Sequence, residues 1–120
     1  MSPDLALDPV ALETLLSLER EQPGAFSEFV RLFVTEAPPL VRRIEQAYAA
    51  RDIDELRHAA HYLRSASLAL GATGLSAISQ AVEKRDPATF GSAEADAELD
   101  LLRHRVRDSL IALLQAVPKI

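Results

Sequence analysis

The sequence predicts an all-α protein, built as an antiparallel up-and-down four-helix bundle with two additional N-terminal helices. Apolar residues recur along the whole chain with the helical period of about 3.6 residues. No stretch alternates between apolar and polar residues, and no Asn-Gly or Asp-Gly pair marks a hairpin turn. The connections between the periodic segments are short, so neighbouring helices are expected to pack antiparallel.

The length and composition place further bounds on the protein. Its 120 residues predict a single helical domain over residues 1–120, with a core spanning about residues 5–117. The absence of cysteine excludes disulfides, thiolate zinc sites and thiol catalysis. No apolar run approaches the roughly 18 residues that span a bilayer, and no secretory signal is visible, so we expect a cytoplasmic protein without membrane insertion. The net charge of −5, with arginines interleaved among acidic residues, argues against nucleic-acid binding.

Two N-terminal helices are predicted from the residues that start and end them. The first begins at Asp8-Pro9, an N-cap side chain followed by a proline at the first helical position, and ends at Pro23-Gly24. The second covers residues 25–36 and is broken by Pro38-Pro39. The apolar stripe of the first is Leu12, Leu15 and Leu16, and that of the second is Phe26, Phe29, Val30, Phe33 and Ala37. All three phenylalanines are predicted to lie in the core.

The first two bundle helices are predicted on either side of residue 52. One starts at Pro38-Pro39, and the other starts at Asp52, where Glu55 three residues later completes a capping-box pattern. The latter ends at Gly71, a left-handed terminator. The predicted buried faces are Leu40, Val41, Ile44, Ala47 and Tyr48 on one helix, and Leu56, Ala60, Leu63, Ser67 and Leu70 on the other.

The last two bundle helices cover about residues 74–85 and 93–117. Thr73 is a candidate cap for the shorter one, and Asp86-Pro87 and Gly91-Ser92 bracket a linker with room for a turn of helix. The predicted inner stripes are Leu75, Ile78 and Val82 on one helix, and Leu99, Leu102, Val106, Leu110, Leu113 and Val117 on the other.

One histidine lies on the outer face of its predicted helix. At about 100° per residue, His61 lies about 140° round from Leu56, far from the apolar seam. It shares its face with Arg57 one turn before and with Arg64, Ser65 and Leu68 after it. An imidazole in water beside two guanidinium groups is suited to holding a phosphoryl group.

A metal site is not expected in this helix. Glu55 and His58 form one Glu-x-x-His pattern, but di-iron bundles need this pattern on two helices together with further inward carboxylates. His58 and His61 also point away from the apolar seam. The other two histidines, His58 and His104, are interpreted as solvated surface residues.

The segment around His61 resembles the signature of histidine-containing phosphotransfer (HPt) domains, in which an alanine-rich lead-in precedes His-x-Leu-Lys-Gly-Ser and a later Leu-Gly. The similarity extends over about residues 5–115. The matching residues are Ala59, Ala60, His61, Leu63, Arg64, Ser65, Ala66, Ser67 and Leu70-Gly71, with Pro23-Gly24-Ala25-Phe26, the Phe-Val-Arg-Leu-Phe run at 29–33 and Ala37-Pro38 before them.

This resemblance implies a bacterial phosphorelay carrier. His61 would accept a phosphoryl group from a receiver-domain phospho-aspartate and pass it to another receiver, with Arg64 and Arg57 stabilising the phosphoryl oxygens. Glu83 matches the position that orients the imidazole, although it is equally read as an ion partner of a nearby arginine. The chain would need no cofactor, magnesium being expected only in the partner receiver, and it would not be an enzyme. The implied partners are response-regulator receiver domains or a hybrid sensor kinase, and the implied state is a monomer.

Three positions depart from the family pattern. Arg64 replaces the usual lysine, Ser65 replaces the usual glycine, and Leu68 is a large apolar residue where small ones are usual. The Ser65 hydroxyl is expected either to fold back on the His61 carbonyl or to contact the phosphoryl group. Ser65, Leu68 and His58 are therefore predicted partner-docking residues. Ser65 and Leu68 also keep open a second hypothesis, an HPt-fold binding module that docks on or inhibits a signalling partner without carrying phosphate.

Overall fold

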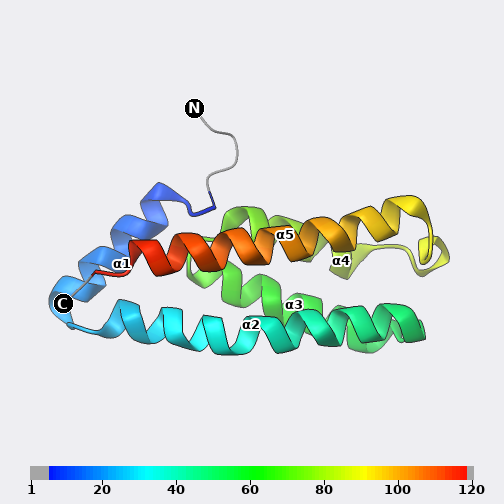
Figure 1. Ribbon diagram of the computed structural model, residues 1–120, viewed down its shortest axis with the longest axis horizontal. Helices are drawn as coiled ribbons and strands as arrows, with labels where there is room; N and C mark the ends of the chain where they lie inside the picture. Colours follow the sequence, from blue (N-terminus) through cyan, green and yellow to red (C-terminus); the bar gives the residue numbers. More distant parts are fainter. Residues whose placement is uncertain (1–5, 119–120) are drawn as a thin grey trace.

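The computed structural model describes residues 6–118, which form five α-helices, one 3₁₀ turn and no β-strand (Figure 1). The all-α prediction is therefore confirmed over this range. The rest of the predicted domain, residues 1–5 and 119–120, lies outside the described residues. The elements are α1 (Pro9–Glu21), α2 (Ala25–Ala50), α3 (Ile53–Ala69), α4 (Thr73–Lys84), the 3₁₀ turn η1 (Pro87–Thr89) and α5 (Ala93–Ala116).

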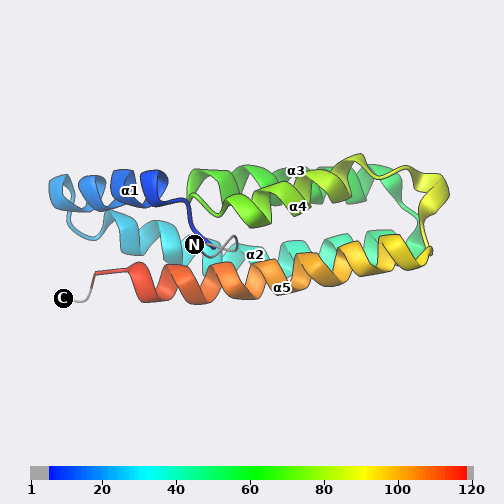
Figure 2. The same ribbon diagram turned by 90° about the horizontal axis from the view of Figure 1, so that it is seen from above.

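Four helices close a ring of contacts. α2 packs against α3, α3 against α4, α4 against α5, and α5 back against α2. Figure 2 shows α3 and α4 in one layer and α2 and α5 in the other. The described helices include none that is long and apolar enough to cross a membrane.

α1 completes the shorter layer. α2 has 26 residues whereas α3 has 17, so at about 1.5 Å per residue the N-terminal part of α2 extends beyond α3. α1 packs against α2 there, in line with α3 and α4 (Figure 2). The backbone N–H of Asp8 donates to the carbonyl of Gly71 at 2.7 Å, which ties the start of α1 to the turn between α3 and α4.

The predicted caps are mostly confirmed. The Asp8 carboxylate accepts a hydrogen bond from the N–H of Ala11, and Asp52 accepts one from the N–H of Glu55.

Gly71 ends the α3 segment with a φ of +73°, a conformation that L side chains rarely adopt. The cap predicted for α4 was one residue off, because Thr73 is the first helical residue and Ala72 is the N-cap.

The predicted helix break at Pro38-Pro39 is wrong, because α2 runs continuously through both prolines. Proline lacks the N–H that donates the helical hydrogen bond, but its φ suits a helix. The two carbonyls that lose their donor belong to Val34 and Thr35, which are at least partly exposed to solvent. Burial on both sides of the prolines favours continuity, with Phe33 and Ala37 buried before them and Leu40 and Ile44 buried after them. Of the two additional N-terminal helices expected, only α1 is separate, since the second is the first part of α2.

The core follows the predicted stripes with one clear exception. Phe26 and Phe33 are buried as predicted, but Phe29 is 43% exposed, so its assignment to the core is wrong. Phe29 lies at the edge of the α2 stripe, and α1 and α3 cover it only in part. The main core cluster comprises Leu15, Phe26, Val30, Phe33, Ala37, Leu40, Ile44, Ala47, Leu56, Ala59, Ala60, Leu63, Leu70, Ala72, Leu75, Val82, Phe90, Leu99, Leu102, Val106 and Leu113.

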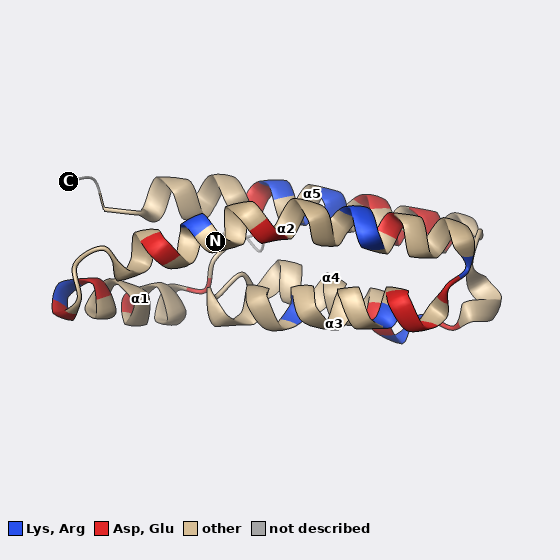
Figure 3. Cartoon of the chain, turned by 90° about the horizontal axis from the view of Figure 1, so that it is seen from below, with Lys and Arg blue, Asp and Glu red and all other residues tan. Residues whose placement is uncertain are grey.

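Charges of both signs alternate along the helices. Figure 3 shows Lys and Arg interleaved with Asp and Glu, with no continuous basic stripe on the face in view. The pair between α2 and α3 is bidentate, with Arg43 donating to Glu55 at 2.9 and 3.0 Å. These hydrogen bonds lower the pKa of the Glu55 carboxyl. Within the described part of the chain, ion pairs between segments distant in the sequence also join Arg85 to Glu98 and Arg103 to Glu45.

The docking of α1 can be tested at Gly71. A Cβ built at this glycine would lie 2.5 Å from the Ala11 Cβ, whereas one at Gly24, also left-handed with a φ of +91°, meets nothing within 4 Å. Gly24→Ala should cost only the backbone strain of roughly 1–2 kcal/mol. Gly71→Ala should cost about 1–3 kcal/mol more, because α1 must move away from the α3–α4 turn. Urea unfolding measures both free energies, and equal losses would contradict this account of α1.

Candidate functional site

His61 lies on the outer face of α3, as its sequence position predicts. Its side chain is 54% exposed, whereas Leu63 and Ala60 beside it in the helix are fully buried. The opposite face of α3 packs against α2 and α4, and this packing fixes the rotation of the helix about its axis. The imidazole is therefore held at the surface by the burial of its neighbours.

One imidazole nitrogen is engaged by the next helix. His61 Nδ1 lies 3.0 Å from Oε2 of Glu83, near the end of α4. An ionised carboxylate only accepts hydrogen bonds, so this contact places the proton on Nδ1 and the lone pair on Nε2. No hydrogen bond to Nε2 is recorded among residues 6–118. Nε2 is thus the nitrogen of His61 with a free lone pair.

Arg64 lies beside both groups. Its Nη2 is 3.2 Å from His61 Nδ1, and its Nε is 3.4 Å from Glu83 Oε1. Because Nδ1 donates its proton to Glu83, it has no lone pair with which to accept from Arg64. Both roles considered for Glu83, imidazole contact and ion pairing with an arginine, therefore occur together.

The Arg64–Glu83 ion pair leaves hydrogen-bonding capacity unused. Arg64 Nε and Glu83 Oε1 are both shielded from solvent, and neither has a hydrogen-bond partner among the described residues. Their separation satisfies an ion pair, but their geometry does not satisfy a hydrogen bond.

The structure separates the other predicted site residues from this cluster. Arg57 and His58 are exposed on α3 and make no recorded hydrogen bond or ion pair with His61, Arg64 or Glu83. His58 instead lies near Glu55, whose carboxyl pKa its charge helps to lower after the stronger effect of Arg43. Leu68 is 59% exposed on the same helix. The roles predicted for Arg57, His58 and Leu68 stay predictions.

Ser65 lies next to the histidine in a shallow depression. The His61 hollow, as we call it, has a volume of about 330 Å³ and is lined by Glu36, His61, Tyr62, Ser65 and Ala66. The hydroxyls of Thr35 and Ser67 donate to the carbonyl four residues earlier, but no such bond is recorded for Ser65 in the described part of the chain. The Ser65 hydroxyl is therefore not folded back on the His61 carbonyl.

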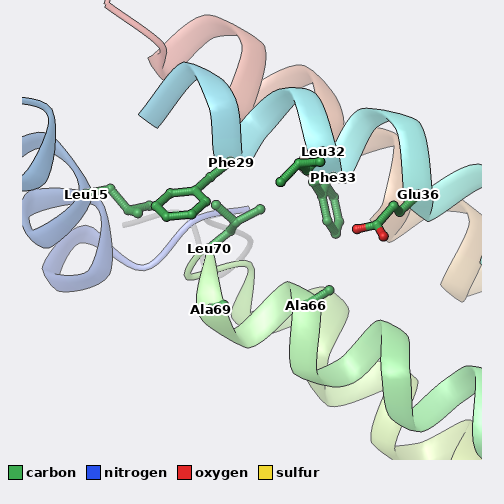
Figure 4. A pocket seen from close by; sticks show the side chains of 8 residues that line it. All are labelled: Leu15, Phe29, Leu32, Phe33, Glu36, Ala66, Ala69 and Leu70. Carbon is green, nitrogen blue, oxygen red and sulfur yellow. The ribbon is translucent and has the colours of Figure 1, made fainter. Parts of the chain in front are cut away.

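A neighbouring groove was not predicted from the sequence. The apolar groove, a pocket of about 220 Å³ between α1, α2 and α3, is lined by Leu15, Phe29, Leu32, Phe33, Glu36, Ala66, Ala69 and Leu70 (Figure 4). Glu36 and Ala66 line both this groove and the His61 hollow, so the two depressions adjoin. The exposure of Phe29 could not be read from the apolar stripe, which predicted its burial, and Leu32, exposed one turn later on α2, lies outside that stripe.

The described residues bring together an exposed imidazole, a carboxylate and a guanidinium. Nε2 of the exposed His61 side chain can attack an electrophilic phosphorus, Glu83 can hold the proton on Nδ1, and Arg64 can bind oxygens of the resulting phosphoryl group. Within residues 6–118, no three or more His, Cys, Asp or Glu side chains are grouped so as to hold a metal ion.

Comparison with known proteins gives one family and one fold. The family model of the Hpt domain matches residues 28–116. Among solved structures, the chain is similar to histidine-containing phosphotransfer protein B (HptB) from Pseudomonas aeruginosa PAO1, with a TM-score of 0.77, 23% sequence identity, and coverage of 96% of this chain and 95% of that chain. No curated protein matches the chain.

The contact between His61 and Glu83 predicts which tautomer the His61 imidazole adopts. At a pH where the imidazole is neutral, long-range ¹H–¹⁵N correlation spectra should show the His61 proton on Nδ1. Glu83→Ala should shift the population toward the Nε2–H form, because the acceptor for Nδ1–H is lost. His104, whose Nδ1 lies 2.8 Å from the Asp100 carbonyl, is the internal control and should not change. A proton on Nε2 of His61 in the unmodified chain would refute the assignment.

Proposed function

Because the chain belongs to the Hpt domain family, whose members are histidine phosphotransfer carriers, we propose that His61 carries the phosphoryl group in a cytoplasmic phosphorelay. His61 would receive it from the phospho-aspartate of one receiver domain and deliver it to the aspartate of another. The observation that carries this proposal is the exposed side chain of His61, whose Nδ1 contacts Glu83 while Nε2 has no recorded hydrogen-bond partner among the described residues. The four helices α2 to α5 serve, in this proposal, as the antiparallel up-and-down bundle that presents His61.

The transfer step is a displacement at phosphorus. The lone pair of His61 Nε2 forms the N–P bond while the P–O bond to the aspartyl carboxylate breaks, and the carboxylate leaves with that electron pair. The imidazole keeps its proton on Nδ1, so no base has to remove one. The positive charge that the ring gains lies beside the Glu83 carboxylate. Delivery to the next aspartate is the reverse of this step.

Arg64 is the proposed ligand of the phosphoryl oxygens. Its Nη2 lies 3.2 Å from His61 Nδ1, so this end of the guanidinium is near enough to the imidazole to turn toward an anion bound there. Arg57, exposed one turn before His61, is proposed as a second and weaker cation. The chain's part is to hold the phosphoryl group, whereas the receiver's acidic pocket would supply the magnesium ion and the catalysis, so we propose a carrier rather than an enzyme.

The receiver would dock over the exposed surface around His61. Ser65 and Leu68 lie on the histidine face, and His58 lies one turn before it. The apolar groove adds Phe29 and Leu32 on α2 to this surface. A mixture of apolar residues around an exposed polar centre is typical of protein interfaces. The same surface would serve a free receiver domain or the receiver of a hybrid sensor kinase.

Substitution of the histidine tests the carrier role directly. After incubation with a receiver domain phosphorylated by acetyl phosphate, the unmodified chain should acquire an acid-labile phosphate, and His61→Gln should acquire none. His58→Gln and His104→Gln remove the other two histidines and should retain the label. If the unmodified chain binds receivers but takes phosphate from none of them, the carrier role is excluded and the binding-module hypothesis holds.

The role of Arg64 has a separate test. Arg64→Ala should reduce the yield or the lifetime of phosphohistidine by about tenfold, because a hydrogen bond to a charged group contributes about 1.5–3 kcal/mol and solvent weakens this one. Arg64→Lys keeps the charge and should recover most of the effect. Circular dichroism should show unchanged helicity in both variants. Transfer at the unmodified rate in Arg64→Ala would remove Arg64 from the site.

A further inference from the structure

Glu36 is a charged residue in an otherwise apolar part of the docking surface. Its carboxylate lies at one end of the apolar groove, with Leu15 at the other end (Figure 4). Because Glu36 also lines the His61 hollow, it stands between the groove and the reactive histidine. A partner that reaches His61 along this groove therefore covers Glu36.

The Glu36 carboxylate has no internal partner in the described residues. No hydrogen bond or ion pair is recorded for it, whereas Glu28 and Glu45, on the same helix, are paired with arginines. The arginine next to the histidine, Arg64, is already engaged by Glu83. Glu36 is thus an unpaired anion on the docking surface.

Covering an unpaired carboxylate with apolar groups is unfavourable. Burial removes its hydration, and a partner that offers only apolar atoms leaves the charge uncompensated. A partner that places a lysine or arginine against Glu36 restores the lost interaction, and one that places an acidic residue there adds repulsion. The residues around Glu36 in the groove, Phe33 and Ala66 among them, offer no competing cation.

We propose that Glu36 selects the receiver partner by charge. The favoured partner, on this inference, is a receiver domain that presents an apolar helix surface to the groove and a lysine or arginine to Glu36. Receivers with a neutral or acidic residue at that place are discriminated against, so Glu36 contributes specificity rather than chemistry. This inference rests on the proposed function, because it takes the partner to be a receiver that exchanges phosphate with His61.

Charge substitutions at position 36 test the inference against a panel of receiver domains from the same genome. For at least one receiver, Glu36→Lys should raise the Kd and lower kcat/KM for phosphotransfer, each by tenfold or more at low salt. Glu36→Gln should change both quantities in the same direction by a smaller factor. Glu13→Lys makes the same charge change at an exposed position of α1 outside the groove, and it should leave both quantities unchanged. Reversing the facing lysine or arginine of the receiver to glutamate should restore binding to Glu36→Lys.

The outcomes separate this inference from the proposed function. Phosphoramidate, a small donor that needs no docking surface, should still label His61 in Glu36→Lys, which shows that the variant keeps a reactive histidine. Charge-dependent binding of receivers without any phosphate on His61 would refute the carrier role and uphold the selection by Glu36. If no receiver in the panel responds to the sign of the charge at position 36, in binding or in transfer, the selection by Glu36 is refuted whatever the labelling shows.

Discussion

The contact between His61 Nδ1 and Glu83 Oε2 joins α3 to α4 and decides which imidazole nitrogen is open to a partner. It depends on the packing of these two helices, since the burial of Leu63 on one and Leu75 on the other fixes which faces turn outward. Arg64 then ion-pairs with the same carboxylate, so one acidic residue organises both the nucleophile and the cation. The orientation of the site therefore follows from the apolar core rather than from the site residues alone.

The helix ends that depend on residues next to them in the sequence were predicted correctly. Asp8 and Asp52 cap the helices they precede, and Gly71 adopts the left-handed conformation expected of a terminator. The helix break predicted at Pro38-Pro39 is wrong because tertiary packing decides whether the helix continues there. This packing buries Phe33 and Ala37 on one uninterrupted face. No property of the proline pair itself distinguishes a break from a continuous helix.

The candidate site was predictable in its centre and not at its edge. The face of His61 and its nearness to Arg64 follow from helical spacing, and Glu83 followed from the family resemblance. The apolar groove and the place of Glu36 depend on how α1, α2 and α3 meet, which no single helix encodes. For the same reason periodicity assigned Phe29 to the core, although its neighbours in the fold cover it only in part.

In the proposed function, the phosphoryl group resides on Nε2 of His61 while Nδ1 keeps its proton. The most direct test is ¹⁵N NMR of the phosphorylated chain, in which coupling to ³¹P identifies the nitrogen that bears the phosphorus. The structure predicts coupling at Nε2 of His61 and a protonated Nδ1 beside Glu83. Phosphorus on Nδ1 of His61, or on His58 or His104 instead, would contradict the account.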